Sequence, residues 1–281
     1  MSRTLNVGCI QTTSGISHAG NAEMLERGIR SLAAQGAQLI ATPEMTGALD
    51  RNRARLLAEA RTPDRDPTLA LACRLARELS VWVLVGSSPV LTQAGAQRLL
   101  NRQFLVSPAG QTVATYDKIH RFDVDLPGGE SYRESALYDA GAVPVLVSTG
   151  VGRLGLSICY DLRFGALYAA LARAGAEILL VPAAFTAITG AAHWHVLLRA
   201  RAIETGCYVV APAQTGTHED GRTTYGHSLI VDPWGRVMAD AGVEPGTIMA
   251  TLDLEQVAQT RARIPALAQA RELPAVQDIT A

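Results

Sequence analysis

The chain has 281 residues, of which 48% are hydrophobic and 18% charged, and this is the composition of a folded protein with one large α/β domain or two small ones. Its formal net charge of −1 offers no basic surface for nucleic acid or an anionic membrane, and no stretch is apolar for long enough to span a bilayer. The composition therefore favours a small-molecule ligand in a pocket, with no nucleic-acid or membrane partner.

The opening residues 5–11 form an apolar run typical of a buried strand, and residues 18–35 carry apolar side chains at helical spacing up to a C-terminal cap at Gly36. Strand and helix patterns then alternate along the chain. The further predicted strands are 37–45, 81–90, 99–106, 111–116, 145–148, 153–158, 177–185, 207–213, 225–231, 236–240 and 247–252. The further predicted helices are 67–79, about 163–174 and about 191–205, with a helical stretch near the C-terminus.

Near-continuous apolar strands between helices predict sheets with both faces covered. Residues 36–43 (GAQLIATP) and 175–182 (GAEILLVP) resemble each other. This is either a coincidence between two ordinary connections or the mark of two similar halves. No linker divides the chain, so we predict one domain over 1–265 and a C-terminal tail over 266–281.

Residues 120–143 lack sustained periodicity and are rich in Gly, Pro and charged residues. An irregular segment of this length within a compact domain is more often a functional loop than a linker. Asp123 and Asp125 in this loop could gate entry to a site.

The four cysteines lie far apart and include no CxxC pair, which argues against a disulfide framework and against a zinc site. We expect no metal. The N-terminus lacks the apolar run of a signal peptide, so we expect a cytoplasmic protein, in which a free thiol stays reduced. Apolar neighbours predict that Cys9, Cys73 and Cys207 are core residues.

Cys159 differs from the other cysteines because a polar cluster follows it, in the run RLGLSICYDLRF. A buried strand ends at residue 158, and a helix is expected to begin near Arg163 with Asp161 as a possible cap. A thiol at such a strand-to-helix turn is exposed at the sheet edge, close to helix amides. This position suits a nucleophile.

A cysteine nucleophile needs a base, because only the thiolate attacks. No histidine carries an obvious partnering motif, whereas Glu44 directly follows an apolar strand and a proline. Lys118 likewise ends a predicted strand. Together Glu44, Lys118 and Cys159 offer a base, a cation and a nucleophile, which is a coherent set for acyl transfer.

The contexts of these three residues, TPEM, YDKIH and SICYDLRF, resemble the signature blocks of the nitrilase (carbon–nitrogen hydrolase) superfamily in order and approximate spacing. The likeness extends to YRES, to FTAITGAAHWHVLLRARAIETGCYVVAPAQTG and to GHSLIVDPWG, and so covers nearly the whole chain. The resemblance implies a four-layer αββα sandwich and a homodimer or larger homo-oligomer.

The resemblance also implies roles for individual residues. Glu44 would be the general base, Lys118 would stabilise the oxyanion, and Cys159 would attack. Glu134 matches a second family carboxylate that helps to position the lysine and the substrate, and the Tyr160 backbone N–H would complete the oxyanion hole. No cofactor is implied.

Within the superfamily, CYDLRF and the run HWHVLLRARAIETGCYVV most resemble the amidases of 2-oxo acids, and look closer to deaminated glutathione amidase than to omega-amidase. A substrate with a carboxylate needs a cation, and Arg163 is our candidate, although pairing with Asp161 is an equal alternative. Phe185 and Thr186 are expected to line the pocket.

Three other interpretations remain at this stage: an omega-amidase, a nitrilase with the same triad, and a non-catalytic protein of the same fold. The amidase-like flanks weigh against a nitrilase, and the intact triad weighs against a non-catalytic protein. His193 and Arg199, on the predicted helix 191–205, are as well explained by packing or an interface as by substrate contact.

Overall fold

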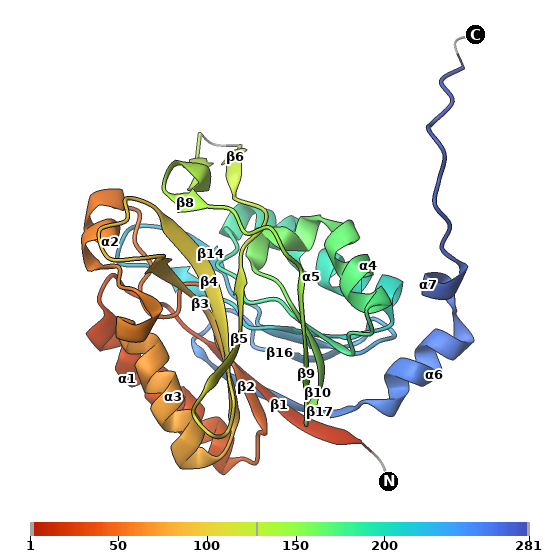
Figure 1. Ribbon diagram of the computed structural model, residues 1–281, viewed down its shortest axis with the longest axis horizontal. Coiled ribbons are helices and arrows are strands. Elements are labelled where there is room, and N and C mark those ends of the chain that lie inside the picture. The colour runs from red at the N-terminus through yellow and green to blue at the C-terminus, as the bar shows by residue number, and fades with distance from the viewer. Residues whose placement is uncertain (1–2, 128, 280–281) are drawn as a thin grey trace.

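In the computed structural model, which describes residues 3–127 and 129–279, two β-sheets lie between two layers of helices (Figure 1). The first sheet has the order β17-β1-β2-β3-β4-β5, with β8 paired to β4. Its strands are β1 (Thr4–Gln11), β2 (Leu39–Ala41), β3 (Trp82–Leu91), β4 (Leu99–Val106), β5 (Thr112–Asp117), β8 (Tyr138–Asp139) and β17 (Gly246–Asp253). The predicted αββα sandwich is confirmed.

The second sheet has the order β16-β15-β12-β11-β10-β9. Its strands are β9 (Val145–Thr149), β10 (Gly152–Leu156), β11 (Ile178–Leu180), β12 (Tyr208–Ala211), β15 (Leu229–Val231) and β16 (Val237–Asp240). Two short hairpins lie outside the sheets, β6 (Asp123–Asp125) with β7 (Ser131–Arg133), and β13 (Thr215–Thr217) with β14 (Thr223–Tyr225).

The helices are α1 (His18–Ala34), α2 (Arg53–Glu59), α3 (Pro67–Leu79), α4 (Gly165–Arg173), α5 (Ala187–Thr205), α6 (Glu255–Arg263) and α7 (Ala266–Gln269). Short 3₁₀ turns lie at η1 (Pro63–Arg65), η2 (Glu134–Ala136) and η3 (Cys159–Arg163). Helices α1 and α3 cover the first sheet, and α4 and α5 cover the second (Figure 1). No helix of the described part is long and apolar enough to cross a membrane.

The two similar segments of the sequence occupy matching places in the two sheets. Strand β2 runs parallel to both of its neighbours, β1 and β3, and strand β11 runs parallel to β10 and β12. In each sheet antiparallel strands flank this parallel core. The hypothesis of two similar halves is therefore confirmed.

The central strands are uninterrupted runs of apolar residues because each of them is covered on both faces. In β2, Leu39 and Ala41 pack into the core between the sheets, while Ile40 faces the helices α1 and α3. This alternation follows from the two-residue period of a strand. All three side chains are fully buried.

Several elements differ from the sequence prediction. Helix α5 begins at Ala187, four residues earlier than expected, because the Thr186 hydroxyl accepts a hydrogen bond from the Thr189 N–H and caps the helix. Gly190 gives the first turn a poor helix propensity, but the fold requires it, since a Cβ there would lie 2.3 Å from Tyr225. Helix α2 and the hairpin β13–β14 were not predicted.

The C-terminal residues leave the sandwich after α7 and extend away from it (Figure 1). Leu267 in α7 still packs against the core, whereas residues 270–279 are exposed and have no regular structure. The end of the expected tail, residues 280–281, lies outside the described part. The division of the chain at residue 265 stays a proposal.

Candidate active site

Cys159 is the first residue of η3, which follows strand β10 of the second sheet. Its backbone N–H donates to the Pro182 carbonyl (2.9 Å), and its φ is +48°, a left-handed conformation that is uncommon for a residue with a Cβ. Such strain costs of order 1–3 kcal/mol and persists where the surrounding structure enforces it, often at functional sites. The residue is 7% exposed and lines a cavity of about 290 Å³.

The side chains of Glu44, Lys118 and Glu134 line the same cavity. Lys118 Nζ lies 2.9 Å from Glu44 Oε1 and between 2.9 and 3.1 Å from the two carboxylate oxygens of Glu134. Glu44 follows β2, Lys118 follows β5, and Glu134 opens η2. The structure thus brings all four predicted catalytic residues to one place, from both sheets.

Asn101, in β4, is a site residue that the sequence reasoning missed. Its Nδ2 donates to Glu44 Oε1 (2.8 Å) and lies 3.1 Å from Glu134 Oε1, so the amide bridges the two carboxylates. The Ala184 backbone N–H donates to the other Glu44 oxygen (2.8 Å). The signal was present in the sequence as a polar residue inside the apolar run LLNRQFLV.

The charges of the site follow from burial and from these contacts. Burial alone would raise the pKa of Glu44, but Lys118, the Cys159 thiol and Asn101 together hold that pKa below its ordinary value. Burial lowers the pKa of Lys118, yet Glu134 and Glu44 outweigh it and raise that pKa well above its ordinary value. Burial and the Glu44 charge raise the pKa of Cys159, against the effect of Lys118. At rest, a neutral thiol therefore lies beside an ionised carboxylate and an ammonium group.

The resting charges predict the pH dependence of hydrolysis. If ionised Glu44 is the base, kcat/KM should stay nearly constant from about pH 6 to pH 9. It should fall only below pH 4.5, because the ordinary pKa of glutamate is 4.5 and that of Glu44 is lower. The raised pKa values of Cys159 and Lys118 add no loss below pH 9. A pH–rate profile, with circular dichroism at each pH to exclude unfolding, measures this. An acid midpoint at about pH 6.5 would instead indicate a histidine base.

Tyr160, Phe185 and Thr186 line the cavity, as expected for substrate-binding residues, but Arg163 does not. The Arg163 guanidinium lies 5.3 Å from the centroid of the Phe185 ring and 5.8 Å from that of Tyr160. Its two terminal nitrogens are 3.3 Å from Nδ1 of His193. Arg163 is therefore held against two side chains of the cavity wall without lining the cavity itself.

Asp161 neither caps α4 nor pairs with Arg163, and both interpretations were wrong. The N-cap of α4 is Phe164, which makes no side-chain cap. The fully buried Asp161 carboxylate accepts from Tyr116 Oη (2.7 Å), from the backbone N–H of Ile158 (2.9 Å) and from that of His120 (3.0 Å). Through these hydrogen bonds Asp161 connects the turn that contains Cys159 to β5 and to the residues that follow it, next to Lys118.

The remaining residues singled out in the sequence lie outside the cavity lining. Asp125 pairs with Arg133 (2.8 Å) across the β6–β7 hairpin, and Asp123 accepts from the Ser135 backbone N–H (2.9 Å), which connects β6 to η2. Arg199 donates to the Gly235 carbonyl (2.7 Å). The loop 120–143 thus contains the β6–β7 hairpin and the turn η2. The hairpin strands have three residues each, which is too short for an alternating pattern to be recognised in the sequence.

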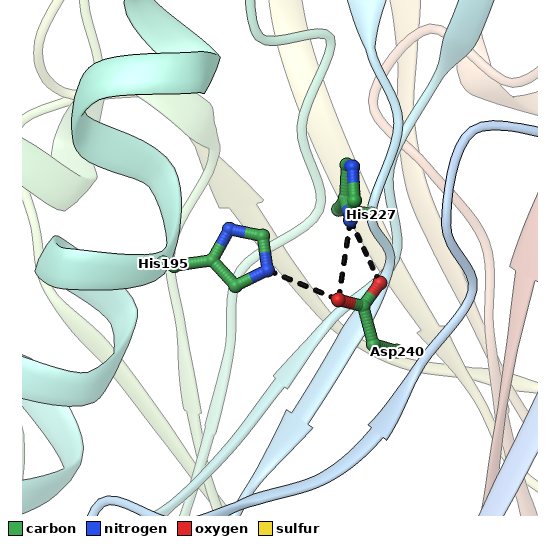
Figure 2. Close-up of side chains that lie close together, drawn as sticks. All are labelled: His195, His227 and Asp240. Atoms are coloured by element: carbon green, nitrogen blue, oxygen red, sulfur yellow. Dashed lines mark hydrogen bonds and ion pairs between the residues drawn. The ribbon is translucent and has the colours of Figure 1, made fainter.

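Within residues 3–127 and 129–279, one group of side chains has the arrangement of a metal site: His195, His227 and Asp240 (Figure 2). His195 Nε2 lies 3.1 Å from Asp240 Oδ2, and His227 Nδ1 lies 2.9 Å from Asp240 Oδ1. These are hydrogen-bond distances between half-exposed groups, and none of the three lines the cavity of Cys159. These hydrogen bonds connect α5 to β16, two elements that are far apart in the sequence. The spacing of cysteine and histidine in the sequence did not predict this cluster.

An αββα sandwich with this set of side chains between its sheets is the architecture of a carbon–nitrogen bond hydrolase. The model of the family described as carbon–nitrogen hydrolase matches residues 6–262. The chain belongs to the carbon–nitrogen hydrolase family, and it is an enzyme of the cysteine-dependent amidase type.

Relatives in several organisms are similar over most of this chain. A deaminated glutathione amidase of Synechocystis is 44% identical over 92% of this chain and 95% of its own length. The human deaminated glutathione amidase is 41% identical over 92% of this chain and 80% of its own. The crystal structure of the C. elegans NitFhit protein superposes with a TM-score of 0.88 at 35% identity, over 95% of this chain. This chain spans 65% of that longer protein.

Proposed function

We propose that this chain is a deaminated glutathione amidase, which hydrolyses its substrate to 2-oxoglutarate and Cys-Gly. The single observation that carries this proposal is the 40–44% identity to relatives of that name over about nine tenths of the chain. The cavity of about 290 Å³ around Cys159 agrees with it, since this volume lies at the lower end of the range for whole organic ligands.

In the proposed acylation step, Glu44 takes the thiol proton as the Cys159 sulfur attacks the amide carbon. Lys118 Nζ and the Tyr160 backbone N–H stabilise the negative charge that forms on the amide oxygen. One such donor in a partly dry site is worth roughly 3–4 kcal/mol. Glu44 then gives its proton to the departing amine, the carbon–nitrogen bond breaks, and a thioester of Cys159 remains.

In the proposed deacylation step, Glu44 takes a proton from water, and the resulting hydroxide attacks the thioester carbon. The carbon–sulfur bond breaks, the thiolate of Cys159 recovers its proton, and the acid leaves. The Glu134 carboxylate accepts from Lys118, from Asn101 and from the Phe122 backbone N–H (2.6 Å), so we propose that it positions the lysine.

We propose that Phe185 and Thr186 hold the acyl part of the substrate and that Arg163 attracts the carboxylate of the 2-oxo acid. Arg163 makes no ion pair with a carboxylate within the described part of the chain, so its charge is available. Its contacts with Phe185 and Tyr160 put that charge next to two rings of the cavity wall.

A comparison of substrates tests the proposed function. We expect kcat/KM for deaminated glutathione to exceed that for 2-oxoglutaramate and 2-oxosuccinamate by about ten-fold or more, since one additional charged hydrogen bond is worth roughly 1.5–3 kcal/mol. Simple nitriles should not react. A much higher kcat/KM for 2-oxoglutaramate would replace the proposal by omega-amidase activity, and the Cys159→Ala protein gives the uncatalysed background.

We further propose that the protein is a cytoplasmic homodimer or larger homo-oligomer. The proposed nucleophile has to remain a reduced thiol, which a cytoplasm ensures. Large apolar side chains stay exposed on and beside α5, where Val196 is 66%, Ile203 54% and Trp234 50% exposed. Such a surface is typical of an interface between protein chains.

A further inference from the structure

The cavity of Cys159 is lined by four arginines that the proposed mechanism does not use, namely Arg51, Arg53, Arg133 and Arg222. Arg133 is already neutralised, since its Nη2 donates to both oxygens of Asp125 (2.8 and 2.9 Å). Within residues 3–127 and 129–279, the side chains of the other three donate to no carboxylate oxygen. Arg222 forms a long ion pair with Asp220 (3.6 Å), whereas Arg51 and Arg53 have no ion pair within the described part of the chain.

Two of these arginines lie against the same side chain, Tyr132 of the β6–β7 hairpin. The guanidinium carbon of Arg51 is 5.7 Å from the centroid of the Tyr132 ring, and that of Arg222 is 6.0 Å from it. Nη2 of Arg51 also donates to the Tyr132 hydroxyl (3.2 Å). Contact with an aromatic ring holds a guanidinium in place without using up its hydrogen-bond donors.

Arg222 is the more enclosed of the two. Its side chain is 20% exposed, and its Nε is buried with no hydrogen-bond partner in the described chain. The nearest carboxylate, Asp220, lies 3.6 Å from Nη2, beyond hydrogen-bond distance. Asp220 Oδ2, the other half of this ion pair, is likewise buried without a hydrogen-bond partner in the described chain. Because the guanidinium makes no hydrogen bond there, its terminal nitrogens can donate to a ligand in the cavity.

Aromatic contacts connect this pair to the residue that follows Cys159. The Tyr132 ring lies 5.0 Å from that of Phe122, which lies 5.1 Å from that of Tyr160, the residue after the nucleophile. Two ring contacts thus separate the arginine pair from the reacting centre. Cys159, Arg51 and Arg222 all line one cavity, so a ligand that extends from Cys159 along this cavity meets the arginine pair.

We propose that Arg51 and Arg222 form a second carboxylate site, which binds the terminal carboxylate of the amine that leaves Cys159. This inference rests on the proposed function, because it assigns the dipeptide end of that substrate. Two acidic groups border this site: Asp220, 3.6 Å from Nη2 of Arg222, and Glu130, which accepts from the Tyr132 hydroxyl (2.9 Å). An amide that releases ammonia has no group for this site.

The test compares deaminated glutathione with the same molecule whose C-terminal carboxylate is a primary amide. For the wild-type protein, the acid should have a kcat/KM about 10- to 100-fold above that of the amide, the range of a charge-assisted pair. In Arg222→Met and in Arg51→Met this ratio should fall toward one. Arg222→Lys should retain part of it, since lysine keeps the charge but not the fork of donors.

Arg133→Met is the matched control, because Arg133 lines the same cavity but is already bonded to Asp125. Its acid-to-amide ratio should equal that of the wild type. Equal kcat/KM for acid and amide in the wild type, or an unchanged ratio in both Arg51→Met and Arg222→Met proteins that melt as the wild type does, would refute the carboxylate site. Failure of the proposed function looks different, since the wild type would then hydrolyse neither compound.

Discussion

Replacing Cys159 by alanine is expected to lower kcat for every amide substrate by at least about 10⁴-fold, because loss of a covalent nucleophile leaves only binding and charge stabilisation. Alanine keeps the Cβ at this left-handed position, so the backbone strain is the same and the melting temperature should change little. The measurement is steady-state hydrolysis of deaminated glutathione, together with mass spectrometry of acid-quenched protein to detect the thioester.

Cys73→Ala is the matched control, since Cys73 lies half-buried on α3, away from the cavity, and burial raises its pKa. This variant should retain wild-type activity and the acyl adduct. Residual activity of the Cys159→Ala protein close to that of the wild type would disprove the thioester mechanism. Loss of activity with an adduct still present would show that the acyl group is attached to a different residue.

The fold was predictable because its central strands are buried on both faces. In β2 and β11 every residue meets either the opposite sheet or the helices, so the sequence shows uninterrupted apolar runs between helical patterns. Glu44 and Cys159 were recognisable for a related reason. Each interrupts such a run at the point where a strand ends, where a polar residue has access to a cavity.

The remaining parts of the site depend on contacts between distant residues, which local patterns do not encode. Asn101 is one polar residue in a long, largely apolar strand, and only its hydrogen bonds to Glu44 and Glu134 show that it belongs to the site. Tyr132 belongs to a hairpin with three-residue strands, too short for a recognisable alternation. Arg222 faces the cavity from the turn between β13 and β14, neither of which was predicted.

Replacing Lys118 by methionine is expected to lower kcat/KM by at least about 10³-fold, because the donor to the amide oxygen is lost. The same change should lower the free energy of unfolding at pH 7 by about 3–5 kcal/mol, since it leaves the buried carboxylates of Glu44 and Glu134 without their cation. Chemical denaturation followed by circular dichroism measures the second effect independently of activity.

The pH dependence of stability should change sign in the Lys118→Met protein. In the wild type the pKa of Glu44 is lowered by folding, so its stabilising contribution is present above pH 4.5 and is lost as the pH falls through the folded pKa. Without the lysine, burial and the charge of Glu134 raise the pKa of Glu44 above its unfolded value. The variant should therefore gain stability as the pH falls from 7 to 5, where the wild type gains none.

Adding Glu44→Gln to Lys118→Met separates the two roles of the lysine. The double variant should recover part of the lost stability at pH 7, because one of the two unpaired buried charges is gone, and it should remain inactive. Between pH 5 and pH 7, the free energy of unfolding of the double variant should also depend much less on pH than that of Lys118→Met. If Lys118→Met were as stable as the wild type and equally insensitive to pH, the lysine would not be what keeps Glu44 ionised, and the base of this enzyme would have to be sought in a different residue.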